Sequence, residues 1–384
     1  MNGGKVWSSV DRGVSADISG VDSRAAPPTQ ESNRNVITLF DFDEGDGSGS
    51  SRKRRNPWII CVVTFAFTFL TILFVMDIAL RAGRRTWLKE ENAAVDKVFS
   101  HLGEPGSIMN GNHTDFLKDV TPKPIHSHND YWRKVPLFSA LQQGCISVEA
   151  DVWLFEQPER RDHLYVGHDE DSLKPDRTFQ SLYIQPLVDI LARQNPITDS
   201  YNFSSRGVFD VAPNQTLTLL VDVKTAGSET WTKVIEQLEP LRERGWLTHF
   251  ANGTIHKRPI TVVCTGNTPF DLLVQNTTYR DYFFDAPLAK LSDGPYDATN
   301  SYYASVSLGG AVGSTWFGSL RGDQVGKIRR QVGEAHAKGL KARYWDLPEW
   351  PVTTRNHIWD TLMEEGVDVL NADDIKAAAK REWK

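Results

Sequence analysis

The chain has 384 residues, of which 40% are hydrophobic and 24% are charged, and its formal net charge is −6. These values are typical of a globular protein, and the length is too great for a single small domain. The negative charge argues against nucleic acid as a partner, because nucleic-acid-binding proteins present basic surfaces. No motif identifies a protein partner.

The first 56 residues differ from the rest in composition. They are rich in Ser, Gly, Asp and Arg and poor in aromatic residues, and they include the run DFDEGDGSGSS. A segment of this kind cannot bury enough apolar surface to offset the entropy of ordering. Residues 1–56 are therefore predicted to be a disordered cytoplasmic tail.

A long uncharged segment follows, from Trp58 to Met76, and only three threonines interrupt its apolar character. It is long enough to cross a bilayer. A cleaved signal peptide would begin near residue 1 and have a shorter apolar region. The sequence therefore predicts a transmembrane signal anchor over 57–80, making the chain a single-pass membrane protein.

The orientation of this segment is not decided by charge, because basic residues lie on both sides of it. Glycosylation motifs are more informative, since all of the N-x-S/T sites follow the apolar run: Asn112, Asn202, Asn214, Asn252 and Asn276. Because the acceptor sites all lie on the C-terminal side of the apolar run, they predict a type II protein of the secretory pathway. Its C-terminal domain would lie in the lumen or outside the cell. Nothing in the sequence identifies the organelle.

Residues 81–120 are predicted to form a helical stalk, in which a helix over about 84–102 is broken by the turn sequence GEPGS. From residue 121 to 384, strand-like and helical patterns alternate. The strand-like runs are PIHSHND, CISVEADVWLF, LTLLVDVKT, PITVVCTG, YFFDA, YYASVSLG, LKARYWDL and VDVLNAD, and the helical runs are 137–143, 182–193, 230–244, 324–338 and 354–365. Glycines at 144, 245, 339 and 366 fit C-terminal helix caps. This alternation predicts an α/β fold consisting of one TIM-type (β/α)₈ barrel over 121–384.

Two acidic residues stand out in the second strand-like run. Glu149 and Asp151 are two positions apart, so on a strand they share a face, while Val148, Ala150 and Val152 occupy the other. Burying two like charges side by side is costly unless a counter-charge such as a metal ion is present. The alternative is a solvated edge strand, which the apolar opposite face does not favour.

Catalytic groups of such barrels gather at the C-terminal ends of the strands. These ends carry His126, His128, Glu149, Asp151, Asp222, Lys224, Trp345 and Asp346, and His168 lies in a short strand-like segment, LYVGHDED. Glu149, Asp151 and Asp222 could chelate one hard cation, magnesium or calcium. His126 is either a structural partner within the barrel or a phosphate contact, and Trp345 is either a packing residue or a substrate contact.

The segments HSHNDYW, VEADVWL, LYVGHDE and LLVDVKT resemble the PLC-like phosphodiesterase superfamily. This superfamily includes glycerophosphodiester phosphodiesterases and the spider-venom sphingomyelinase D enzymes, and the most similar family is the fungal altered inheritance of mitochondria protein six family. The resemblance extends to the end of the chain through GLKARYWDLPEW and GVDVLNADDI. One departure is that His128-Asn129-Asp130 replaces the H-R-G of glycerophosphodiesterases, which removes the usual phosphate-binding arginine.

The resemblance implies a metal ion held by Glu149, Asp151 and Asp222, catalytic histidines at 128 and 168, and a phosphate-facing Lys224. His126 and Trp345 are the candidate substrate contacts, and Asn129 and Asp346 are candidate supporting residues. The expected activity is metal-dependent cleavage of a glycerophosphodiester or a (lyso)phospholipid, by water or by a neighbouring hydroxyl of the substrate.

Two other functions remain open at this stage. The barrel could be an inactive, tethered binding or scaffold protein, because fold does not prove activity. The H-x-H pair could also belong to an amidohydrolase-type metal hydrolase, although the later histidines do not lie at strand ends. The three cysteines are expected to be small buried hydrophobes. Cys145 and Cys264 could also form a disulfide.

Overall fold

The computed structural model describes residues 58, 61–76, 78–79, 116–157, 159–196, 205–315 and 319–383. The chain divides into two units, Met1–Thr71 and Ile72–Lys384. The predicted tail and most of the predicted stalk lie outside the described residues. So do two of the predicted glycosylation sites, Asn112 and Asn202.

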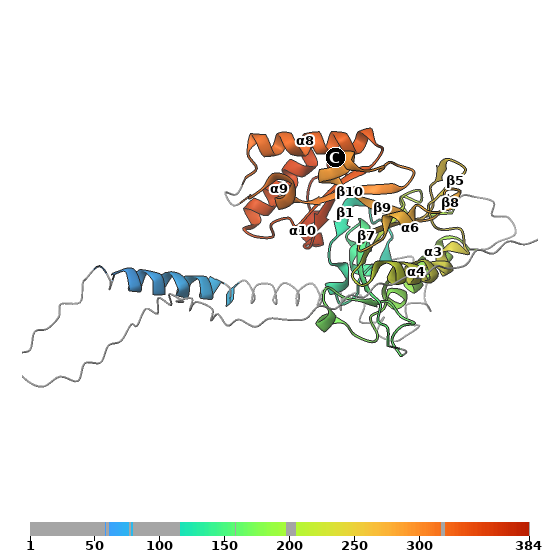
Figure 1. The fold of residues 1–384 in the computed structure, drawn as a ribbon, viewed down its shortest axis with the longest axis horizontal. Helices are drawn as coiled ribbons and strands as arrows, with labels where there is room; N and C mark the ends of the chain where they lie inside the picture. The colour runs from blue at the N-terminus through green and yellow to red at the C-terminus, as the bar shows by residue number, and fades with distance from the viewer. Residues whose placement is uncertain are drawn as a thin grey trace, which may run out of the picture. The chain divides into compact units, whose positions relative to one another are not determined.

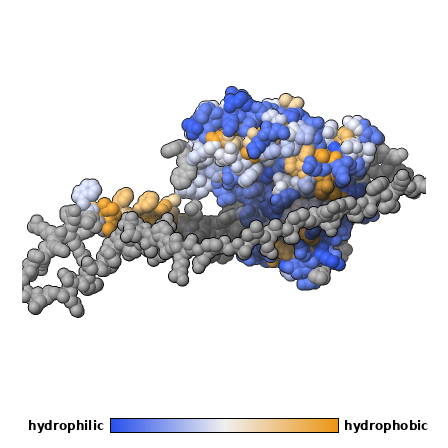
Figure 2. All heavy atoms as spheres, viewed as in Figure 1, coloured by the Kyte–Doolittle hydropathy of each residue, from blue (hydrophilic) through white to orange (hydrophobic). Residues whose placement is uncertain are grey.

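Residues 61–76 form a helix with exposed side chains, and its apolar surface is visible in Figure 2. Within the part of the chain that the structure describes, no helix combines the length and the apolar character needed to cross a membrane. The transmembrane helix predicted over 57–80, a range that includes positions outside the described residues, is therefore not supported.

Eight parallel strands close into a barrel, as the alternating pattern predicts (Figure 1). Each strand pairs with its neighbours, and β1 pairs with both β12 and β2, which closes the sheet. All eight strand-like runs of the sequence are barrel strands. They are β1 (Lys123–Ser127), β2 (Cys145–Trp153), β4 (Leu217–Val223), β7 (Ile260–Gly266), β9 (Phe283–Pro287), β10 (Ser301–Ser307), β11 (Lys341–Trp345) and β12 (Val369–Ala372).

Two smaller features extend this sheet system. The short β3 (Tyr165–Val166) pairs antiparallel with the end of β2 and places His168 beside the barrel mouth. A separate antiparallel sheet combines β5 (His249–Ala251), β6 (Thr254–His256) and β8 (Tyr279–Arg280).

Helices occupy the predicted positions between the strands, with boundaries shifted by a few residues. The α-helices are α2 (Phe138–Gln142), α3 (Gln185–Gln194), α4 (Gly227–Gln237), α5 (Glu239–Arg242), α6 (Phe270–Leu273), α7 (Leu308–Val312), α8 (Gly322–Ala337), α9 (Val352–Glu364) and α10 (Ile375–Ala379). The shorter elements are η3 (Asp130–Trp132), η4 (Glu170–Ser172), η6 (Leu288–Asp293) and the π-helical η5 (Gln180–Ile184). The four glycines predicted as helix caps all have positive φ, a conformation that a side chain would strain.

The hydrophobic core has two parts, on either side of the barrel wall. Outward residues such as Val148, Ala150 and Val152 are fully buried in the larger part, together with residues of the surrounding helices. A small inner cluster, formed by Leu220, Val263, Tyr303 and Val369, fills the barrel itself. Polar residues also lie inside the barrel. Asp222 shares β4 with Leu220, and Asn371 shares β12 with Val369. Cys145 and Cys264 are buried free thiols, as predicted, and they form no disulfide. The prediction of a buried residue is wrong for Cys61, which is exposed on the helix over 61–76.

Candidate functional site

Strand β2 carries Glu149 and Asp151 into the barrel interior. It lies between β1 and β4, and the two carboxylate residues are only 5% and 2% exposed. Strand β2 is therefore not a solvated edge strand, the alternative that the sequence left open. Two neighbouring buried acids must instead be stabilised by cationic groups, hydrogen bonds or protonation.

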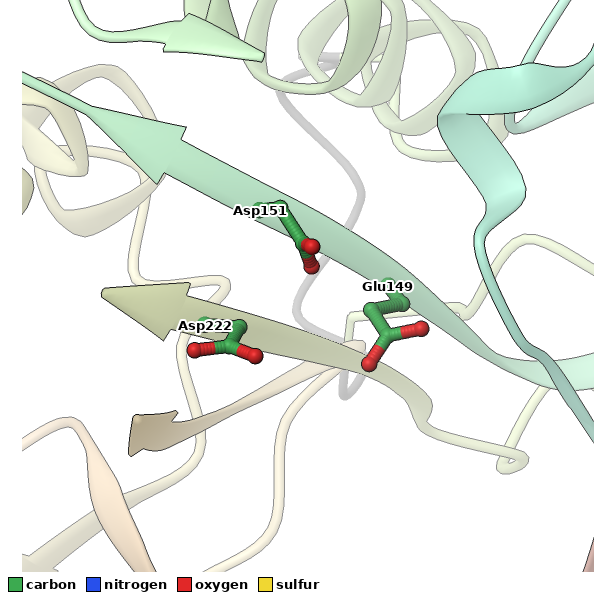
Figure 3. A group of neighbouring side chains, drawn as sticks. All are labelled: Glu149, Asp151 and Asp222. Carbon is green, nitrogen blue, oxygen red and sulfur yellow. The ribbon is translucent and has the colours of Figure 1, made fainter. Parts of the chain in front are cut away.

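Asp222 completes a group of three carboxylates. It is the direct partner of Asp151 across β2 and β4, and ligand oxygens of Glu149, Asp151 and Asp222 all lie within 4.8 Å of one another (Figure 3). Gly266 at the end of β7 makes room for this arrangement, because a Cβ there would lie 2.0 Å from Asp222 Oδ1. We call Glu149, Asp151, Asp222 and Lys224 the mouth cluster.

Lys224 is the cation of the mouth cluster. Its Nζ lies 2.9 Å from Asp151 Oδ2 and 2.8 Å from Asp222 Oδ2. One ammonium does not balance three acids: burial, together with the charges of Glu149 and Asp222, raises the pKa of Asp151 to about 8. The buried Asp151 Oδ1 also accepts no hydrogen bond from any described residue. The cluster thus has both a free acceptor and excess negative charge, which suits a hard divalent cation.

His128 lies on one side of the mouth cluster, where residues far apart in the sequence hold it. Its Nδ1 lies 2.9 Å from Asp373 Oδ1, and Nε2 is 3.8 Å from Glu149 Oε2. Burial lowers the pKa of His128, but the charge of Glu149 and the hydrogen bond to Asp373 outweigh it and raise the pKa above 6.5. Glu149 and Asp373 therefore stabilise the protonated form of this ring.

Asn129 supports the same side, as the sequence predicts. Its φ of 47° is left-handed, a conformation that asparagine tolerates better than most residues. In this conformation its backbone N–H donates to Glu149 Oε2 at 2.8 Å. Its side-chain Nδ2 donates to Asp373 at 3.0 Å. Asn129 thus orients both a carboxylate of the mouth cluster and the partner of His128.

His168 lies on the other side and is more accessible, with 52% of its side chain exposed. Its Nδ1 is 3.9 Å from Asp151 Oδ2 and 3.3 Å from the hydroxyl of Tyr131. Tyr131 in turn donates to Asp151 Oδ2 at 2.6 Å. The two histidines therefore flank the carboxylates from different directions.

Below the mouth cluster is a second group of polar residues, the inner layer: His126, Asp285, Arg343 and Asn371. Arg343 lies 3.3 Å from His126 Nε2, 3.4 Å from Asp285 Oδ2 and 3.1 Å from Asn371 Oδ1. Its Nη2 is also 3.7 Å from Glu149 Oε1, which connects the inner layer with the mouth cluster.

His126 is fully buried in this layer. It contacts Ser147 Oγ through Nδ1 at 2.7 Å. Burial, followed by the charge of Arg343, lowers the pKa of His126 to about 4. A neutral ring with both nitrogens occupied within the barrel favours the structural alternative for His126 over a phosphate contact.

Two of the predicted site residues, Trp345 and Asp346, lie outside the mouth cluster. Trp345 at the end of β11 is 41% exposed, so it is accessible and not packed inside the barrel. Asp346 is exposed with φ of 55°, and no hydrogen bond links it to the mouth cluster among the described residues. The later histidines also lie elsewhere: His249 and His256 stack on each other in the small sheet, and His336 contacts Asp368. This placement gives no support to an amidohydrolase-type site.

Several residues of the site were not identified from the sequence, namely Tyr131, Asp285, Arg343 and Asp373. Asp285 and Asp373 follow the same strand-end rule that selected Asp222, so applying it to β9 and β12 would have found them. Arg343 is two positions before Trp345 and shares its face of β11. Tyr131 lies in the HSHNDYW motif, but no pattern in the sequence indicates that its hydroxyl reaches Asp151.

Comparisons with known proteins give a domain match and several named relatives. Residues 114–285 match the model of an AIM6-like phosphodiesterase domain. An altered inheritance of mitochondria protein 6 homolog from Arthroderma benhamiae is 43% identical over 276 residues, covering 69% of this chain and 85% of the relative.

Two further relatives carry the name altered inheritance of mitochondria protein 6. The Eremothecium gossypii protein is 38% identical, over 67% of this chain and 68% of the relative. The Saccharomyces cerevisiae protein is 34% identical, over 68% of this chain and 71% of the relative. These matches show that the chain belongs to the family of altered inheritance of mitochondria protein 6.

Proposed function

We propose that the protein is a divalent-metal-dependent phosphoric diester hydrolase or lyase. The observation that carries this proposal is the mouth cluster, in which three carboxylates within 4.8 Å of one another lie at the ends of adjacent barrel strands, between two histidines. The name of the matching domain supports the same reaction class. One magnesium or calcium ion is the expected cofactor, since all three candidate ligands are carboxylates.

Glu149, Asp151 and Asp222 would hold this ion. When bound, it would neutralise the phosphate oxygens and so stabilise the charge that develops in the transition state. Lys224 supplies a second positive charge beside the same position.

The two histidines divide the proton transfers. His128, held by Asp373 with its Nε2 toward Glu149, accepts a proton from the attacking group. His168, on the accessible side, donates a proton to the leaving oxygen. The attacking group is water or a neighbouring hydroxyl of the substrate, and the second case gives a cyclic phosphate.

The substrate class is a glycerophosphodiester or a (lyso)phospholipid. A lipid substrate is favoured if the domain is tethered to a membrane, and the case for tethering rests on the apolar sequence from Trp58 to Met76 alone. The proposed location is the secretory pathway, with the barrel in the lumen or outside the cell. In keeping with this proposal, the described acceptor residues Asn214, Asn252 and Asn276 are all exposed.

An N-glycosidase experiment tests the location. The protein made in a eukaryotic host should shift in gel mobility after treatment, and its C-terminal domain should resist protease in sealed microsomes. Unchanged mobility together with a protease-accessible domain would reverse the proposed orientation.

A turnover assay tests the activity and separates an enzyme from an inactive scaffold. The full chain is assayed on glycerophosphodiesters and lysophospholipids, with and without a chelator, and magnesium is then added back. We expect phosphodiester cleavage that the chelator abolishes and magnesium restores. If the folded protein cleaves none of these diesters at any metal concentration, the binding or scaffold function is the better description.

A further inference from the structure

The end of the HSHNDYW motif has no role in the function proposed so far. Residues Asp130–Trp132 form η3, directly after the first barrel strand. This turn is firmly held, because the buried Asp130 accepts hydrogen bonds from Ser127 Oγ and from the Leu137 N–H, both at 2.6 Å. A turn fixed so closely beside the mouth cluster can place side chains with precision.

The hydroxyl of Tyr131 lies among three groups of the site. It is 2.6 Å from Asp151 Oδ2, 2.7 Å from Asn129 Oδ1 and 3.3 Å from His168 Nδ1, and the tyrosine is 3% exposed. A phenol has one proton to donate and can also accept. The carboxylate and the amide oxygen are acceptors, so the phenolic proton points toward them, and the phenolic oxygen can accept a hydrogen bond from His168 Nδ1–H.

The next residue of the same turn also contacts His168. The rings of Trp132 and His168 meet edge to face, with centroids 5.4 Å apart and planes at 67°. His168 is otherwise half exposed, so these two aromatic residues are its main described supports. The hydrogen bond to Tyr131 and the ion-pair contact to Asp151 are both at Nδ1, and no hydrogen bond from a described residue occupies Nε2 of this ring.

We propose that Tyr131 is a positioning residue that connects Asp151 of the mouth cluster to His168. By accepting a hydrogen bond from Nδ1–H, its hydroxyl selects the Nδ1-protonated form of the neutral ring and turns Nε2 toward the substrate. The leaving-group part of this inference rests on the proposed function, in which His168 donates a proton. The tautomer part does not, because it concerns the ring alone.

The test compares Tyr131→Phe with a matched control, Tyr183→Phe. Tyr183 is also fully buried, and its hydroxyl donates to the backbone oxygen of Glu149 at 2.7 Å and lies 3.1 Å from Asp130. It contacts no side chain of the mouth cluster and neither histidine in the described structure. Both variants therefore lose one buried tyrosine hydroxyl, but only Tyr131→Phe removes the contact to His168.

The first measurement is nitrogen NMR of the ¹⁵N-histidine-labelled full chain, at a pH where the His168 ring is neutral. His168→Ala assigns the signal. We expect the Nδ1-protonated form in the parent and in Tyr183→Phe, and a change toward the Nε2-protonated form, which prevails in water, in Tyr131→Phe. An Nε2-protonated ring in the parent protein overturns the proposal, whether or not any variant folds.

The second measurement is the rate on two diesters, one with an alkoxide leaving group and one with a nitrophenyl leaving group. Tyr131→Phe should lose about tenfold to a hundredfold on the first, in the range seen when supporting partners of site residues are removed, and much less on the second. Tyr183→Phe should show no such difference. Equal losses of Tyr131→Phe on both substrates contradict the positioning role. A parent without turnover contradicts the proposed function, and the tautomer measurement then still decides the role of Tyr131.

Discussion

The mouth cluster and the inner layer are two polar groups inside one barrel, and they differ in how their charges are balanced. In the inner layer, Arg343 contacts His126, Asp285 and Asn371, and His126 is kept neutral by burial and by the arginine. In the mouth cluster, Lys224 contacts Asp151 and Asp222, while Glu149 lies 3.7 Å from Arg343 of the inner layer. Asp151 has a raised pKa and a buried oxygen without a hydrogen-bond partner in the described structure. Asp285 of the inner layer also has a raised pKa, about 6, and a buried Oδ1 without a hydrogen-bond partner in the described structure, but Arg343 lies beside this single acid. The mouth cluster instead has two acids, Asp151 and Asp222, at one lysine, which suits a cation.

This difference predicts two kinds of variant. Changes at the mouth should alter catalysis or metal binding and leave folding largely intact. Changes in the inner layer should alter stability, because removing its arginine leaves the buried acids beside it without that cation.

The largest effect is expected at the histidines flanking the mouth. With an alkoxide-leaving diester, His168→Ala should lose about a hundred- to ten-thousandfold in rate, the usual range for one proton-transfer catalyst. A nitrophenyl leaving group departs without a proton, so the His168→Ala loss should shrink on that substrate while the His128→Ala loss persists. Rates of both folded, metal-loaded variants on both substrates decide this. Equal His168→Ala losses would show that His168 is not the general acid.

The inner layer should give the largest effect on stability. Arg343→Met leaves Glu149 and Asp285 without their buried cation and should lower the free energy of unfolding by about 3–5 kcal/mol. The matched control is Arg329→Met, because Arg329 is an exposed arginine paired with Glu365 and its loss should have little effect on the free energy of unfolding. Denaturant titration measures both. A cost for Arg343→Met no greater than that for Arg329→Met would remove the structural role from the inner layer.

Asp151→Asn should weaken magnesium binding by about a hundredfold or more, since removal of even a supporting group of a metal site typically costs ten- to a hundredfold. The metal-free variant should unfold at or above the parent's temperature, because one of the repelling acids is gone. Asp171→Asn, at an exposed acid in η4, is the control. Isothermal titration calorimetry measures the affinities, and parent-like binding by Asp151→Asn would show that Asp151 is not a ligand.

The smallest effect is a pH dependence that originates in the inner layer. The pKa of His126 is about 4 in the folded protein and 6.5 in the unfolded chain, so the unfolded chain binds more protons between these values. Stability is therefore lost as pH falls, by about 2 kcal/mol from pH 6.5 to pH 5. His126→Gln should lack this part of the slope when both proteins are unfolded in chelator. Identical slopes would mean that His126 is protonated in the folded state.

The barrel was predictable because its signal is local and repeated. The alternation of strand-like and helical runs identified all eight strands, and the strand-end rule selected Glu149, Asp151 and Asp222. The supporting residues were harder to predict, because their roles depend on closure of the barrel. Asp373 reaches His128 only because β12 pairs with β1, and Arg343 reaches His126 across the barrel interior. The role of the Tyr131 hydroxyl depends on the exact direction of one turn, which no periodicity encodes.

The central claim is that Glu149, Asp151 and Asp222 together hold a divalent cation. Crystals of the protein soaked in manganese, with diffraction collected at an energy where manganese scatters anomalously, test it most directly. We expect one anomalous peak at the mouth cluster, about 2.0–2.6 Å from an oxygen of each of the three carboxylates. A well-ordered mouth cluster without a peak at high manganese concentration, or a peak that contacts none of the three carboxylates, would contradict the claim.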